Sequence, residues 1–339
     1  MTPDIFAEWY RRQGHHVIRS ESSYWFDAGP RVYQAFPFGW LIQPSKDELR
    51  RTMIKHGVAS LRYSAPIDSP SGKVSYHVTL TNPYHMELLR SQARNAVKRG
   101  MLRCVIDQVP FERVATEGWN LQQDTLDRQG RNGSMNATEW RRVCLSAVNL
   151  AGFEAWSALV DGEMAAALIT CRVNDTFYVP YAFSHRKFLD FYVNNALFYS
   201  VSCNFLAREG INGIFFTVQS LDAPKSVDDF KFRMGLHAKS VRQCVAFHPV
   251  LEPFVTGSTH RIVNKLIHRY PNKAALAKAE GMIRFYLEGK IPIDQQEWPE
   301  CVANLKPGPA ASLSSAVPET LTHEQSTLIP SNGGRDAKP

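Results

Sequence analysis

The sequence has 339 residues, of which 44% are hydrophobic and 21% are charged. This composition excludes a wholly disordered chain, and no stretch approaches the ~18 consecutive apolar residues of a membrane span. The net charge is +7, and residues 1–110 hold 15 Lys and Arg against 9 Asp and Glu. The basic surplus fits an anionic partner, such as a pyrophosphate, a tRNA end or a membrane surface, and fits a solvated basic face equally well.

The cysteines and the first residues bear on the compartment. Six cysteines are widely spaced and form no Cys-x-x-Cys pair, which favours reduced thiols over disulfides or a zinc site. The first ten residues lack the apolar stretch of a signal peptide. Together these features predict a cytoplasmic protein.

Residues 1–100 predict an abbreviated N-terminal αβ lobe. Ser45 and Glu48 form a capping box at the start of a helix, and Asn82 with Pro83 is typical of the start of another. The elements expected here are a strand over 32–43, a helix over 46–56, strands over 58–63 and 73–80, and a basic helix over 83–99.

Residues 101–250 predict a second, better-defined αβ core. Asp161-Gly162 and Asn174-Asp175 each separate two apolar runs and are typical of hairpin turns. The later strand–helix–strand order requires a parallel pair with a right-handed crossover. The elements expected here are a strand over 101–108, helices over 111–129 and 137–150, strands over 155–160, 164–173 and 176–183, a helix over 195–208, a strand over 214–218, a helix over 228–234 and a strand over 240–247.

The remaining residues divide into two parts. Residues 251–300 predict a helical extension that is interrupted at Pro271. Residues 301–339 are rich in Pro, Ser and Thr and contain no aromatic residue, which predicts a disordered tail.

Three local sequences resemble the FemAB-type branch of the GNAT-like acyl-CoA N-acyltransferases. They are the basic stretch Leu88–Gly100, the Gly162-Glu163 hairpin before an alanine-rich strand, and the Phe-Lys element within Asp229–Gly235. The order of elements from 101 to 247 also looks like the GNAT fold. The resemblance implies an α/β (α+β GNAT-like) fold, with a mixed, partly splayed sheet flanked by helices.

The resemblance also implies a function. A member of this group would transfer an acyl group from acyl-CoA, its co-substrate, to an amine on a cell-envelope precursor or polysaccharide. It would hold no permanently bound cofactor and no metal. Its partners would be a small-molecule acyl donor and an amine-bearing acceptor, and not DNA.

One departure from the GNAT pattern keeps two alternatives open. The Gly-rich loop that holds the CoA pyrophosphate is absent, and residues 185–194 stand in its place. An aminoacyl-tRNA-dependent aminoacyltransferase is therefore the first alternative, with tRNA as a partner. A non-catalytic binding module on the same fold is the second, and peripheral membrane contact stays open.

Acyl transfer needs a deprotonated nucleophile, a stabilised oxyanion and a protonated leaving group. In GNAT-like folds backbone N–H groups stabilise the oxyanion where two parallel strands part, here 176–183 and 214–218. Tyr181 and Ser184 end the first of these strands. Tyr181 is a candidate acid, or simply a core tyrosine, and Ser184 is a candidate substrate contact.

An anion site is expected where the following helix begins, because a helix N-terminus offers free N–H groups. Arg186, Lys187, Asn194 and Asn195 are the candidate donor-binding residues there, although an asparagine at that place is also a common helix cap.

The remaining candidates follow the second strand or lie on other helices. Asp222 is a candidate general base, and Gln219 and Ser220 are candidate acceptor contacts. The resemblance implies that Lys231 lies near the donor. Arg94, between Arg90 and Lys98 on one helix face, is a candidate substrate contact or part of a solvated stripe.

Overall fold

The structure is a computed structural model that describes residues 2–130, 135–219, 226–270 and 274–306. The described residues belong to one unit that ends at Lys306. The predicted break at 131–134, Pro271 and residues 307–339 of the predicted tail lie outside the described residues. Residues 301–305 lie in a short 3₁₀ helix in which Val302 is buried, so the disorder predicted for them is wrong.

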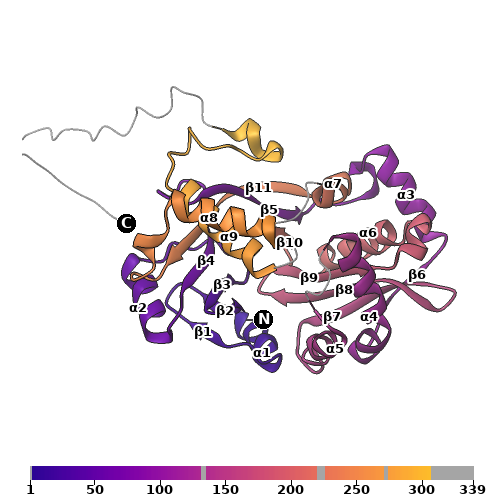
Figure 1. Cartoon of the computed structure of the whole chain (residues 1–339). Helices are drawn as coiled ribbons and strands as arrows, with labels where there is room; N and C mark the ends of the chain where they lie inside the picture. The colour runs from indigo at the N-terminus through magenta and orange to yellow at the C-terminus, as the bar shows by residue number, and fades with distance from the viewer. Residues whose placement is uncertain (1, 131–134, 220–225, 271–273, 307–339) are drawn as a thin grey trace, which may run out of the picture. The chain divides into compact units, whose positions relative to one another are not determined.

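Within the described residues, eleven strands form one mixed sheet in the order β1-β2-β3-β4-β11-β5-β10-β9-β8-β7-β6 (Figure 1). Antiparallel hairpins join β7, β8 and β9, as the turn dipeptides predict. The strands are β1 Val17–Arg19, β2 Tyr24–Gly29, β3 Val32–Phe36, β4 Ser60–Ala65, β5 Lys73–Thr81, β6 Val105–Gln108, β7 Phe153–Val160, β8 Glu163–Val173, β9 Thr176–Ser184, β10 Gly213–Val218 and β11 His237–Phe247.

Helices cover both faces of the sheet, and none of those described is long and apolar enough to cross a lipid bilayer. The α-helices are α1 Pro3–Arg12, α2 Lys46–His56, α3 Ser91–Met101, α4 Phe111–Arg128, α5 Ala137–Leu145, α6 Val193–Leu206, α7 Ser226–Arg233, α8 Gly257–Arg269 and α9 Ala274–Glu288. Short 3₁₀ helices are η1 Met86–Leu88, η2 Arg186–Phe191, η3 Glu252–Phe254 and η4 Glu300–Leu305.

The segment from β6 to β11 has the order of a GNAT-like fold. Strand β6 is followed by α4 and α5, the β7–β9 meander, α6, β10, α7 and β11. Strands β9 and β10 are parallel and α6 connects them, which confirms the predicted crossover. The fold class predicted from the sequence, a mixed and partly splayed sheet flanked by helices, is thereby confirmed.

Two apolar clusters hold this half of the sheet between helices. On one face α3 and α6 pack on the strands, and the rings of Phe177 and Phe205 stack with centroids 3.7 Å apart. On the other face α1, α4 and α5 cover the strands around the fully buried Trp140. Figure 1 shows α6 and α4 on opposite sides of β7–β9. The helices therefore fix where β9 ends and where α6 begins.

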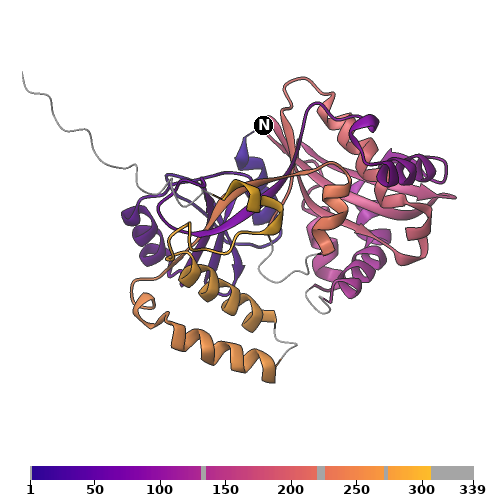
Figure 2. The ribbon, with the colours of Figure 1, turned by 90° about the horizontal axis from the view of Figure 1, so that it is seen from above.

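The N-terminal residues contribute more strands than the sequence predicted. Helix α1 and strands β1 and β2 were not predicted, and the strand expected over 32–43 ends at Phe36, before Pro37. Strand β5 lies between β10 and β11, so residues 73–81 complete the sheet of the second half. Helices α8 and α9 lie side by side, and α9 packs against β11 and β5 (Figure 2). The division of the chain at residue 100 stays a prediction.

The basic helix expected over 83–99 begins later and ends later. Helix α3 starts at Ser91 after the short η1, and it runs through Gly100 to Met101, so the strand expected from 101 begins only at Val105. Gly100 lies inside the helix and does not end it. Its role is to allow close packing. A Cβ at Gly100 would lie 2.6 Å from the carbonyl oxygen of Tyr192. The glycine thus allows α3 to approach the start of α6.

Replacing Gly100 with alanine is expected to lower the free energy of unfolding by about 1–3 kcal/mol, because the added methyl group meets backbone that cannot move aside cheaply. Gly257 in α8 is a matched control, since nothing lies within 4 Å of a Cβ there. Gly257→Ala should be neutral or stabilising by up to about 1 kcal/mol. Urea denaturation of both variants measures the difference, and equal stabilities would contradict the packing role.

Candidate functional site

Strands β9 and β10 run together for only a short distance and then part. Their parallel register covers three consecutive residue pairs, which end at Phe215 opposite Tyr178. Beyond this point β10 continues alongside β5, with Thr217 opposite Val78, while β9 continues alongside β8. Backbone groups of β9 and β10 that face this gap have no strand partner across it. The parting of the two strands is the geometry that the resemblance to GNAT-like folds implied.

A β-bulge in β9 marks the place where the strands part. Ile169 pairs with Tyr181 and Cys171 pairs with Tyr178, so Val179 and Pro180 together oppose the single residue Thr170. Such a bulge bends the strand and shifts its side-chain alternation by one residue. Tyr181 therefore turns to the α4 and α5 face, as Tyr178 does. Pro180 has no N–H, so it offers the gap no donor.

A cleft of about 170 Å³ opens between the separated strands. Val179 and Pro180 form one wall and Phe216 to Val218 form the other, while Phe6, Gln34 and Phe38 close it from the N-terminal residues. The lining is apolar except for Gln34, Thr217 and the backbone. The cleft is suited to a narrow chain that is held by backbone hydrogen bonds.

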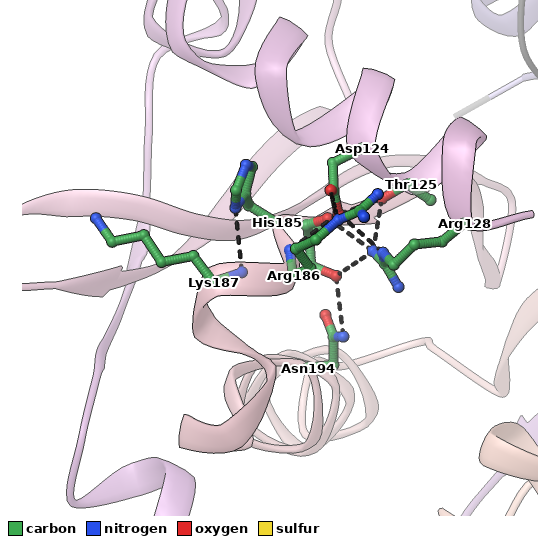
Figure 3. A network of polar contacts seen from close by, with 8 residues as sticks. Asp124, Thr125, Arg128, His185, Arg186, Lys187 and Asn194 are labelled. Atoms are coloured by element: carbon green, nitrogen blue, oxygen red, sulfur yellow. Dashed lines mark hydrogen bonds and ion pairs between the residues drawn. The ribbon is translucent and has the colours of Figure 1, made fainter.

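A polar network ties the end of β9 and η2 to α4 (Figure 3). Asp124, with a side chain only 8% exposed, accepts hydrogen bonds from the Arg186 backbone N–H at 2.9 Å, from the Arg186 side chain, and from Arg128 Nε at 2.9 Å. Burial opposes ionisation of Asp124, but the hydrogen bonds from Arg186 and Arg128 outweigh it and hold the pKa of the carboxyl below its usual value.

Ser184 lies at the centre of the same network. Thr125 Oγ1 donates to the Ser184 carbonyl at 2.9 Å and accepts from the Ser184 N–H at 3.0 Å. Arg128 donates to the carbonyl and to Oγ of Ser184, and Asn194 Nδ2 donates to Ser184 Oγ at 3.0 Å. Asn194 is therefore not the cap of α6, because that place is taken by Tyr192. The network holds the start of α6 at a fixed place beside the end of β9.

The two cations predicted to bind an anion both have carboxylate partners. Arg186 is paired with Asp124, and Lys187 donates to Glu163 at 2.9 Å. Lys187 and Arg186 nevertheless keep side chains that are 60% and 57% exposed. Asp124 is shared between Arg186 and Arg128, so each predicted cation has a carboxylate partner but the group keeps a net positive charge.

A basic pocket of about 400 Å³ lies beside the start of α6 and is lined by residues of α3 and α7. Arg99 of α3 and Arg233 of α7 reach it, together with Asn195, and the rings of Tyr192 and Phe230 form part of its wall. The Arg99 guanidinium lies 6.0 Å from the centre of the Tyr192 ring. Within the described residues neither arginine has a carboxylate partner, so this pocket is cationic. Of the predicted donor residues, Asn195 alone lines it.

Tyr181 lies within the core rather than in the cleft. Its ring meets Trp140 edge-on at 5.6 Å and Trp9 at 6.2 Å. Burial raises the pKa of Tyr181 to about 12, so its hydroxyl is protonated at neutral pH. Its predicted part as an acid stays a prediction.

The other predicted residues are divided among three places. Gln219 follows β10 and donates its backbone N–H to the Tyr76 carbonyl at 3.0 Å. Arg94 donates to the carbonyls of Glu87 and Leu89, which ties η1 to α3. Lys231 lies in α7 and is half-buried. Ser220 and Asp222 lie outside the described residues, so their roles stay predictions.

Sequence reasoning missed Asp124, Arg128, Arg99 and Arg233. Arg99 adjoins the predicted basic stripe, and Arg233 lies inside the Phe-Lys element, so both were within reach of a search for cations near the donor. Asp124 and Arg128 had no such signal. They are separated by 62 and 56 residues from Arg186 and Ser184, which they contact.

No protein-family model matches the sequence, and no curated protein matches it either. Among solved structures, FemX is similar at a TM-score of 0.50 and 9% identity, over 73% of this chain and 92% of that one.

Weaker likenesses are to the C-terminal domain of a putative lysylphosphatidylglycerol synthetase from Agrobacterium fabrum and to a tandem GNAT protein from the clavulanic acid biosynthesis pathway. The first has a TM-score of 0.47 and 10% identity over 71% of this chain and 87% of that chain. The second has a TM-score of 0.40 and 12% identity over 68% and 81%. The order of elements, the parted strands and the match to FemX give this chain a GNAT-like fold.

Proposed function

We propose that the chain is a cytoplasmic acyltransferase of the FemAB-type branch, which moves an acyl group from acyl-CoA to an amine on a cell-envelope precursor or polysaccharide. The observation that carries this proposal is the parting of β9 and β10 at the Val179–Pro180 bulge. A bulge that separates two parallel strands frees backbone donors at the edge where α6 begins. This arrangement is suited to a thioester carbonyl.

The chemistry is attack by the acceptor nitrogen on the carbonyl carbon of the donor thioester. The C–N bond forms, the oxyanion is stabilised by backbone N–H groups, and the C–S bond breaks as the thiolate takes a proton. The nucleophile loses its own proton to a general base, for which Asp222 remains our candidate. Lys231 is the candidate donor to the leaving group, because Tyr181, the other predicted candidate, faces α4 and α5 and does not line the cleft.

The donor's phosphates are proposed to bind in the pocket of Arg99 and Arg233. It is cationic, it is next to the start of α6, and the rings of Tyr192 and Phe230 offer surfaces for a planar base. Asn195 adds an amide to the same wall. Arg186 and Lys187, the residues first expected to do this, would instead hold η2 in place through their carboxylates.

A second candidate function is aminoacyl transfer from aminoacyl-tRNA. It is favoured by the pairing of Arg186 with Asp124 and of Lys187 with Glu163, which leaves η2 without a free cation for a pyrophosphate among the described contacts. A terminal nucleotide has the same phosphate and base chemistry as the CoA end, so the basic pocket suits both donors.

The test is a thermal shift of the full chain with CoA, acetyl-CoA and a longer acyl-CoA, repeated with Lys231→Ala. A ligand at one hundred times its dissociation constant stabilises the fold by about 2.7 kcal/mol, which is a shift of several degrees. We expect a shift with acyl-CoA that Lys231→Ala weakens. A cooperative melt with no shift from any CoA would remove acyl-CoA as donor. Aminoacylated tRNA would then be added as the ligand in the same assay. A protein that shifts with neither ligand would be a non-catalytic module.

A further inference from the structure

A third cavity, of about 340 Å³, lies against β9 and β10 next to the 170 Å³ cleft. It shares Tyr178 and Phe215 with the 170 Å³ cleft, so the two spaces are neighbours along β10. Trp40 forms an apolar wall, and His77 of β5 and Lys239 of β11 reach it from the strands beyond. None of these polar side chains has a part in the proposed donor site.

A chain of hydrogen bonds leads from Arg62 through Gln243 and Ser64 to His77. Arg62 Nε donates to Gln243 Oε1 at 3.0 Å, and because a guanidinium can only donate, this sets the orientation of the Gln243 amide. Gln243 Nε2 then donates to Ser64 Oγ at 2.5 Å. The Ser64 hydroxyl keeps its own proton for His77 Nε2, which lies 2.8 Å away. When this hydroxyl donates to Nε2, a neutral His77 carries its proton on Nδ1.

His77 is neutral because it is buried. Only 2% of the residue is exposed, and burial, together with Lys239 and Arg62 nearby, lowers the pKa of His77 to about 3. Within the described part of the chain, Nδ1 has no hydrogen-bond acceptor. In the Nδ1–H tautomer this N–H is a neutral donor in the lining of the cavity.

The hydroxyl of Tyr178 is a second donor without a partner among the described residues. Tyr178 is 3% exposed, and burial, with Asp175 next in effect, raises the pKa of its hydroxyl well above the usual value. Gly39 leaves room over this hydroxyl, because a Cβ there would lie 3.1 Å from the oxygen. The O–H can therefore donate to a ligand in the cavity, which Tyr178 lines.

Lys239 supplies the charge. It lies opposite His77 in the β11–β5 register, and its exposed ammonium has no carboxylate partner within the described residues. Asp175, the acidic residue of the lining, is held at the rim by Asn212 Nδ2 at 2.7 Å and by Thr176 Oγ1 at 3.1 Å. The two neutral donors and the single cation converge on one space.

We infer that this cavity binds the carboxylate of the acceptor substrate, through His77 Nδ1–H, the Tyr178 hydroxyl and the Lys239 ammonium. One cation and two neutral donors match a single negative charge with two oxygens better than a phosphate dianion. The acceptor is then a molecule that carries both an amine and a carboxylate, with its amine near the parting of β9 and β10. Its identity as acceptor rests on the proposed acyl transfer, whereas the carboxylate site does not.

The experiment is an NMR titration of the ¹⁵N-histidine-labelled full chain with propionate, with inorganic phosphate as a separate arm. We expect the free protein to show His77 as the Nδ1–H tautomer. Propionate should shift the His77 resonances saturably, and Lys239→Met should raise the dissociation constant about tenfold. Gly39→Ala, which covers the Tyr178 hydroxyl, should weaken binding as well. Lys98→Met, an exposed lysine of α3, is the matched control and should leave the titration unchanged.

Several outcomes would overturn the inference. The hydrogen-bond chain is wrong if His77 is protonated on Nε2 in the free protein. The site is wrong if neither anion shifts His77 saturably, or if Lys98→Met weakens binding as much as Lys239→Met. Tighter binding of phosphate than of propionate would overturn the inference that the ligand group is a carboxylate. No donor is present in this titration, so its failure is separate from a failure of acyl-CoA to bind.

Discussion

Replacing both Arg99 and Arg233 with alanine is expected to weaken donor binding about 100-fold. Each guanidinium lacks a carboxylate partner among the described residues and lines the 400 Å³ pocket beside α6. A hydrogen bond from a charged group to a phosphate contributes roughly 1.5 kcal/mol or more, and about 1.4 kcal/mol is a tenfold change in affinity. Isothermal titration calorimetry with acyl-CoA, or with the donor that stabilises the fold, measures the effect.

Arg141 provides the control for this prediction. It is an exposed arginine of α5, on the opposite face of the sheet, so Arg141→Ala removes a charge without touching the pocket. Its effect should be less than twofold at 0.15 M salt, because charges beyond about 8 Å are screened. Single Arg99→Ala and Arg233→Ala variants should each lose about tenfold. Equal affinities for the double variant and Arg141→Ala would place the donor elsewhere.

Replacing Asp124 with alanine is expected to lower the free energy of unfolding by about 3 kcal/mol. The Asp124 carboxylate accepts hydrogen bonds from Arg186 and Arg128. The substitution removes this acceptor from the buried end of the network. Leaving the partners of a buried charge unpaired costs free energy of folding. Because both arginines reach solvent, water compensates part of this cost. Chemical denaturation gives the value, and Asp127→Ala on the exposed face of α4 is the matched control.

The pH dependence of stability in an Asp124→Asn variant gives an independent test. The folded pKa of Asp124 is lowered, so its stabilisation is fully present above the unfolded pKa of about 3.9 and is lost as the pH falls through the folded value. The stability difference between the wild type and Asp124→Asn should therefore be constant near pH 7 and shrink below about pH 4. A difference that persists unchanged to low pH would show that the carboxylate charge is not the cause.

Local signals in the sequence were enough to predict the half of the fold that carries the site. Asp161-Gly162 and Asn174-Asp175 predicted the meander, and the apolar run after α6 predicted the parallel strand β10. These elements depend on residues that are close in the chain. The α/β class followed from that order of elements, and the parted strands were implied by the resemblance to the GNAT-like fold.

The rest depends on contacts that no short window contains. The place of β5 between β10 and β11 is set by residues more than 130 positions away. Arg186 looked like a free cation because its partner, Asp124, lies on another element. The bulge at Val179–Pro180 turns Tyr181 into the core, and only the pairing of β8 with β9 reveals that the strand alternation has shifted.

The place of β5 has a consequence for synthesis. Its residues, 73–81, leave the ribosome early, but the strands that flank it end only at Val218 and Phe247. Until then a strand with five consecutive buried positions has two unsatisfied edges, and such edges favour pairing with other chains. A nascent chain of this protein is thus exposed to misassembly for about half of its translation, and the sheet is complete only when β11 has been made.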